Sequence, residues 1–199
     1  LARDVGTADL AVVASEKRSL DECFRLFDVL HSLIDSAAVL RRLVIEAVED
    51  FAAENVVYLE LRTTPRRDIA DIPTARQYVQ TVVSAVRECE ARPNLRNDIV
   101  VRLLLSVNRA GSLEDALEVV ELAGEFASSG DGNAIVVGLD FSGNPTKGAF
   151  GTFVQAFDRA RALQLPITFH IGEVENPTEI SDMLAYARKG DRFGHALKL

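Results

Sequence analysis

An alternation of short apolar runs with amphipathic helical segments constrains this chain more than any other sequence feature. Apolar runs predict strands at residues 56–61, 99–105, 135–141 and 166–171, and residues 192–196 resemble the start of another. Helical spacing of apolar residues covers 73–89, 113–126, 149–163 and 178–189. Two more helices are expected between residues 21 and 53, divided near Asp35 and Ser36. Ser112 is the expected N-cap of the helix over 113–126, and Gly130 follows its end. This alternation predicts a parallel sheet joined by crossover helices.

An open doubly wound sheet and a (β/α)₈ barrel both remain compatible with that order of elements. No Gly-x-Gly-x-x-Gly fingerprint follows the early strands, which weakens the dinucleotide-binding version of the open sheet. Polar residues share one parity toward the carboxyl ends of the strands: Glu60 and Arg62, Arg102 and Ser106, Asp140 and Ser142, Thr168 and His170. Alternate residues lie on one face of a strand, so a shared polar interior is indicated. We therefore favour the barrel, whose active sites lie at these carboxyl ends.

The composition fits one globular domain over residues 1–199. Of the 199 residues, 48% are hydrophobic and 26% charged, which suffices for one sizeable core. The net charge of −8 disfavours nucleic acid as a partner, because its phosphates would be repelled. No apolar run approaches the roughly 20 residues that span a bilayer, so no membrane association is expected. The two cysteines, Cys23 and Cys89, lie far apart, and a reducing cytoplasm is the expected compartment.

The sharpest local signal is the segment His170-Ile171-Gly172-Glu173, directly after a predicted strand. A histidine at a strand end can ligate a metal, and a carboxylate nearby can move protons for a metal-activated water. By itself such a pair is more often a satisfied histidine beside a solvated glutamate. His195, at the end of the next predicted strand, raises the odds of a shared site, although a structural role stays open for it as well.

Three further places hold candidate binding residues. Thr63, Thr64, Pro65 and Arg66 follow the first predicted strand and offer hydroxyls and a guanidinium to a phosphate, or form an exposed basic turn. Gly143 is a turn glycine or a backbone N–H brought close to a ligand. His31 lies on an amphipathic helix, where a surface or partly buried histidine is the default.

Four motifs, in their order and spacing, resemble the adenosine deaminase superfamily from about Arg18 to Ala196. They are Tyr-Leu-Glu-Leu-Arg-Thr-Thr-Pro-Arg at 58–66, Gly-Leu-Asp-Phe-Ser-Gly-Asn-Pro at 138–145, His-Ile-Gly-Glu at 170–173 and Arg-Phe-Gly-His at 192–195. The similarity is strongest to the adenosine deaminase-like branch, which converts N6-methyl-AMP and related N6-substituted AMP to IMP and an amine. The resemblance implies a (β/α)₈ barrel that holds one Zn²⁺ ion.

The resemblance also implies roles for individual residues. His170 is similar to a zinc ligand, Glu173 to the acid that protonates the purine ring, and His195 to the histidine that orients the attacking water. Gly143 is similar to a glycine whose N–H holds the purine. In the nucleotide-specific branch, His31, Thr63, Thr64, Pro65 and Arg66 match positions that contact the substrate, at its phosphate end. Asn108 stands where the branch often has aspartate.

Other parts of the family pattern are absent from these residues. The family begins its barrel with a His-x-His strand and ends it with an Asp-Asp pair, whereas His31, His170 and His195 are the only histidines here. We therefore expect an incomplete barrel of about five parallel strands, a truncated form that has no deaminase activity alone. A monomer is expected for the complete enzyme. An adenosine deaminase for the free nucleoside, or a truncated form that binds without turnover, are the alternatives.

Overall fold

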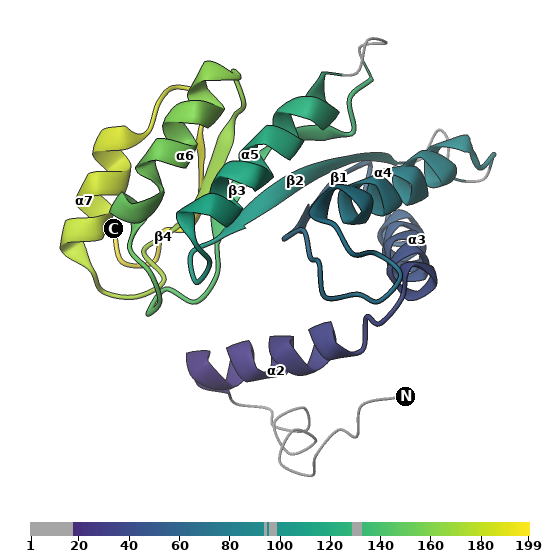
Figure 1. Cartoon of the computed structure of the whole chain (residues 1–199), viewed down its shortest axis with the longest axis horizontal. Coiled ribbons are helices and arrows are strands. Elements are labelled where there is room, and N and C mark those ends of the chain that lie inside the picture. The colour runs from purple at the N-terminus through teal and green to yellow at the C-terminus, as the bar shows by residue number, and fades with distance from the viewer. Residues whose placement is uncertain (1–17, 94, 96–98, 129–132) are drawn as a thin grey trace.

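The computed structural model describes residues 18–93, 95, 99–128 and 133–199, in which five strands alternate with helices (Figure 1). The strands are β1 (Tyr58–Thr63), β2 (Val100–Asn108), β3 (Val136–Ser142), β4 (Ile167–Ile171) and β5 (Arg192–His195). The helices are α2 (Leu20–Ser32), α3 (Ala37–Ala53), α4 (Ala75–Ala91), α5 (Leu113–Ala127), α6 (Phe150–Ala162) and α7 (Pro177–Tyr186).

The five strands form one parallel sheet in the order β1-β2-β3-β4-β5. Spatial order follows sequence order throughout, whereas a doubly wound sheet reverses direction at a switch point. Ser106 lies opposite Asp140, and Asp140 lies opposite Thr168, so polar residues of one parity form a row across the strands. The parity that the sequence indicated is therefore a real face of the sheet.

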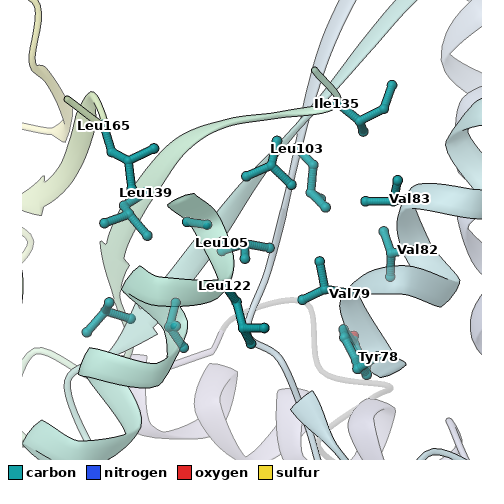
Figure 2. Packing of buried hydrophobic residues seen from close by; sticks show 14 of the residues in the cluster. Tyr78, Val79, Val82, Val83, Leu103, Leu105, Leu122, Ile135, Leu139 and Leu165 are labelled. Carbon is teal, nitrogen blue, oxygen red and sulfur yellow. The ribbon is translucent and has the colours of Figure 1, made fainter. Parts of the chain in front are cut away.

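The helices α4 to α7 cover the other face and bury the core. Alternate residues of β2, including Leu103 and Leu105, point toward α4 and α5, where they meet Val79 and Leu122 among other buried side chains (Figure 2). These four side chains are at most 6% exposed. At roughly 25 cal/mol per Å², this apolar burial is the main term that holds the helices on the sheet.

The sheet curls so far that residues on its two edge strands form an ion pair across the polar face. Arg192 of β5 donates from Nη2 to Oε2 of Glu60 on β1, at 2.5 Å. Tyr58 donates its hydroxyl to the other oxygen of Glu60, at 2.8 Å. A flat or gently twisted sheet would hold its first and fifth strands roughly 19 Å apart, given a spacing of about 4.8 Å. The sheet is thus half of a barrel, and the expectation of an incomplete (β/α)₈ barrel is confirmed.

Several sequence-based boundaries and one side chain need correction. The first strand covers Tyr58–Thr63 and not residues 56–61, so Thr63 belongs to the strand and not to the following turn. The last helix ends at Tyr186, before the expected residue 189, and α4 begins after Thr74, which caps it. Arg102 lies opposite Glu60 on the polar face as expected, but near the amino end of β2, where its guanidinium turns to Glu90 and Asn133 and does not reach the pocket. Gly130 lies outside the described residues.

Figure 1 shows α2 standing apart from the layer formed by α4 to α7. A capping box between Ser19 and Glu22 begins α2, and no residue of this helix is fully buried. Within the described ranges, no helix is long and apolar enough to cross a membrane.

Candidate active site

A pocket of about 740 Å³ lies between α2 and the carboxyl ends of the strands. Asp28, His31, Ser32, Ile34, Arg62, Thr63, Thr64, Arg66, Asp68, Tyr78, Ser106, Asn108, Asp140, Ser142 and His170 line it. Most of these side chains are polar, and they come from segments as distant in sequence as α2 and β4. This volume suits a ligand the size of a nucleotide.

Asp140, on β3, is the buried centre of the pocket wall, with only 1% of its surface exposed. Ser106 donates its hydroxyl to Oδ2 at 3.1 Å, and Arg62 donates to Oδ1 at 3.3 Å. The Nε2 atom of His170 lies 3.2 Å from the same Oδ1. Burial alone would raise the pKa of Asp140, but the contact with His170 and the charge of Arg62 outweigh it and lower that pKa. The aspartate is therefore an anion that orients its cationic and imidazole neighbours.

His170, Glu173 and His195 converge beside this pocket although they leave the sheet at two strand ends. One potential ligand atom from each residue lies within 4.8 Å of the others. The two imidazole rings meet edge to face with centroids 5.0 Å apart, and Nε2 of His195 lies 3.1 Å from Oε1 of Glu173. His195 has a φ of 62°, a left-handed conformation uncommon outside glycine. The end of β5 holds this strained backbone where its side chain reaches Glu173.

The chemistry of this donor set fits a zinc ion. Two imidazoles and one carboxylate are among the ligands that zinc takes, and three converging protein donors are typical of a catalytic site. Arg62 limits the arrangement, because its Nη1 lies 2.5 Å from Nε2 of His170. A metal bound at that nitrogen would have to displace the Arg62 guanidinium from it.

Arg66 lies in the part of the pocket away from His170 and connects it to α2. Its Nη1 donates to the carbonyl oxygen of His31 at 2.8 Å, and its Nε and Nη2 donate to the two carboxylate oxygens of Asp68, each at 2.8 Å. Partial desolvation and the charge of Arg66 lower the pKa of His31. The hydroxyl of Thr63 pairs with that of Tyr78 at 2.8 Å. The guanidinium is thus held in a fixed orientation at the pocket edge.

Gly143 follows β3 at a place where only glycine fits. Its φ is 106°, and a Cβ atom there would lie 2.4 Å from Oδ1 of Asn108. Gly143 does not line the pocket itself, so its expected contact with a ligand stays a prediction.

The structure groups the expected site residues in two neighbouring sets. His31, Thr63, Thr64 and Arg66 line the pocket together with His170, whereas Pro65 belongs to a smaller depression beside it. Glu173 and His195 join His170 in the metal-capable cluster. Sequence reasoning did not single out Asp68 or Tyr78 as site residues, since a charged loop residue and a residue on a helix face carry no local signal.

Comparison with known proteins adds a family to this geometry. The family described as adenosine deaminase matches residues 5–199. The chain is 41% identical over 203 residues to the N6-mAMP deaminase of Arabidopsis thaliana, covering 93% of this chain and 55% of that protein. A crystal structure of Arabidopsis ADAL complexed with GMP superposes with a TM-score of 0.84 at 43% identity, over 96% of this chain and 55% of that one.

A second Arabidopsis ADAL structure, complexed with IMP, has a TM-score of 0.83 at 42% identity, with the same coverage of 96% and 55%. The chain therefore spans about half the length of the relatives that it matches.

Proposed function

The chain belongs to the adenosine deaminase family, and from this premise we propose that it forms about half of a zinc-dependent nucleotide deaminase. The proposed reaction adds water to the purine C6 of N6-methyl-AMP, or a related N6-substituted AMP, and releases IMP and the amine. The name of the Arabidopsis N6-mAMP deaminase, and the GMP and IMP bound in the crystal structures of Arabidopsis ADAL, support this substrate class. The observation that carries the proposal is the convergence of His170, Glu173 and His195 beside a nucleotide-sized pocket.

Of the three donors that could reach a metal ion, we assign only His170 as a ligand, because the family resemblance gives Glu173 and His195 roles in proton transfer and water orientation. Bound zinc would supply Lewis acidity and lower the pKa of a coordinated water to about 7. Asp140 holds the His170 imidazole in place, because its buried carboxylate contacts that ring. Ser106 in turn fixes the carboxylate by donating a hydrogen bond to it. The remaining family ligands, a His-x-His pair and an aspartate, have no counterpart among the motifs present in these residues.

Glu173 and His195 would move and direct protons. In this proposal Glu173 donates a proton to the purine nitrogen next to C6, which makes that carbon more electrophilic. His195 accepts a hydrogen bond from the attacking water and aligns it with C6. Their separation of 3.1 Å lets the two groups share a proton between steps. The N–H of Gly143 would hold the base in the plane that this transfer needs.

The other part of the pocket would bind the phosphate. Arg66 has N–H groups to spare, since a guanidinium carries five and its contacts with His31 and Asp68 use three. Thr63 at the end of β1 and Thr64 after it line the pocket beside it, as does His31, and Pro65 follows in the adjoining depression. A nucleoside without phosphate would leave these donors unpaired, which favours the nucleotide over free adenosine.

We also propose residues 1–199 as one partial barrel domain, and the cytoplasm as the compartment, given the unpaired thiols Cys23 and Cys89.

The test uses the complete gene product that contains this chain. Purified protein is incubated with N6-methyl-AMP, AMP and adenosine, with and without a zinc chelator, and IMP or inosine is separated by chromatography. We expect chelator-sensitive formation of IMP from N6-methyl-AMP. Preference for adenosine would establish the nucleoside deaminase instead, and binding of IMP without turnover of any substrate would establish a non-catalytic form.

A further inference from the structure

A buried ion pair that the proposed mechanism does not use lies directly behind the site. Arg109 follows β2 and is 3% exposed, and it donates to the Glu179 carboxylate in the first turn of α7. A small cavity between this pair and the segment His170–Glu173 has both Arg109 and Glu179 in its wall. Buried ion pairs contribute little net stability, because desolvation offsets their attraction. Stability alone therefore does not account for this pair.

Arg109 holds the loop that carries Gly143. Its main-chain N–H donates to the carbonyl of Ser142 at 2.9 Å, and its Nε donates to the carbonyl of Lys147 at 3.0 Å. At Gly148 the φ is 55°, and a Cβ atom would lie 2.0 Å from the carbonyl oxygen of Arg109. Arg109 therefore contacts the segment between β3 and α6 near both of its ends.

Glu179 holds the other side of the contact. Its Oε1 accepts the N–H of Phe150 at 2.8 Å. This bond caps α6, whose N-cap position, Ala149, has no side-chain oxygen to do so. The main-chain N–H of Glu179 in turn donates to Oδ1 of Asn176 at 3.3 Å, which fixes the end of the loop that carries Glu173. A single carboxylate therefore joins α6, α7 and Arg109.

We propose that Arg109 and Glu179 are positioning residues that set the spacing between Gly143 and Glu173. This inference rests on the proposed function, in which Gly143 and Glu173 contact the same purine base from two separate loops. The ion pair links those two loops through Arg109, which bonds to the loop after β3, and through α7, which directly follows the loop of Glu173. Misplacement of a reacting group by about 1 Å costs on the order of 100-fold in rate. The pair would accordingly affect turnover and base binding, and leave the phosphate end unaffected.

A second buried ion pair provides a matched control. Arg161, at the end of α6, pairs with Asp191 just before β5, and its guanidinium lies 5.3 Å from the centroid of Tyr186. Arg109 likewise lies 5.2 Å from the centroid of Phe141. The two pairs are alike in burial and chemistry, but Arg161–Asp191 lies at the amino ends of β4 and β5. In this class of barrel that end serves stability and the carboxyl end serves catalysis.

The experiment compares Arg109→Met, Arg109→Lys, Glu179→Gln and Arg161→Met in the complete gene product. We measure kcat and KM for N6-methyl-AMP, affinity for IMP by calorimetry, and affinity for ribose 5-phosphate, which lacks the base. Arg109→Met is expected to lower kcat by about 100-fold and to weaken IMP binding, with ribose 5-phosphate binding unchanged within about twofold. Arg109→Lys should recover part of kcat, since it keeps the charge but not both contacts.

Glu179→Gln keeps an oxygen for the Phe150 N–H and thus keeps the cap of α6, so it tests the charge even if Arg109→Met fails to fold. Arg161→Met should reduce the melting temperature and leave kcat near wild type. Equal effects of Arg109→Met and Arg161→Met on kcat, or equal losses of IMP and ribose 5-phosphate affinity, would overturn the positioning role. If the wild-type protein neither turned over N6-methyl-AMP nor bound IMP, the proposed function would be contradicted, and this inference would fall with it.

Discussion

Nε2 of His195 lies 3.1 Å from Oε1 of Glu173, although one residue ends β5 and the other follows β4. The register of the parallel pair β4–β5 makes this contact possible, because it places Ile171 opposite His195. Two groups with different proposed tasks, proton donation and orientation of water, are thereby held at hydrogen-bond distance. Each of these tasks can be tested separately.

Glu173→Gln should lower kcat for N6-methyl-AMP by about 10² to 10⁴-fold and change KM little, because it removes a proton donor but hardly changes the volume of the side chain. Steady-state kinetics of the complete gene product measure this effect. Glu175→Gln, an exposed change in the same loop, is the control and should match wild type. A kcat for Glu173→Gln within threefold of wild type would show that Glu173 is not the proton donor.

Metal content distinguishes the two histidines of the cluster. We expect His170→Ala to purify with little bound zinc, and His195→Ala to keep its zinc while losing turnover, since only His170 is proposed as a ligand. Elemental analysis by mass spectrometry, with circular dichroism to confirm folding, measures this. Loss of zinc from both variants would make His195 a ligand too, as the 4.8 Å cluster geometry allows.

Arg66→Met should raise KM for N6-methyl-AMP by roughly 10 to 100-fold, the loss expected for a charged hydrogen bond of about 1.5–3 kcal/mol. Inhibition by a nucleoside without phosphate should not change. Arg67→Met is the control, because Arg67 pairs with Asp115 and Glu118 on α5 instead of facing the pocket. Equal losses for nucleotide and nucleoside would show that Arg66 acts on the structure of α2 and not on phosphate.

Asp191→Asn should destabilise the fold by about 3 kcal/mol at neutral pH, because it leaves Arg161 buried without its charged partner. Burial would raise the pKa of Asp191, but the hydrogen bonds from Arg161 and the Arg188 amide outweigh it and lower that pKa.

The folded protein therefore binds this proton less readily than the unfolded chain, whose aspartate pKa is about 3.9. The stabilising contribution is complete above that value and is lost as the pH falls through the lower folded pKa. Thermal melts of wild type and variant at several pH values should show a difference that shrinks below about pH 4. A difference that stays constant down to pH 2 would contradict this sign.

Much of the fold could be predicted from the residues themselves. The alternation of apolar strands and amphipathic helices is local information, and so is the parity that places Asp140 and His170 on one polar face. Strand ends were less certain: Thr63 extends β1 because its backbone pairs with Leu105 of β2, and a propensity cannot anticipate that partner. The motif at His170 and Glu173 was readable because its parts are three residues apart.

The sequence alone therefore determined the order of the elements, the polar face and the identity of the candidate chemical groups. Only the tertiary structure decided which of those groups meet. Arg192 reaches Glu60 across 132 residues, and Arg109 reaches Glu179 across 70, because parallel strands curl and bring distant loops to one end of the sheet. The positions of such charged side chains follow no sequence period from which their partners could be predicted. Their pairing follows from sheet curvature and burial, which the whole chain sets together.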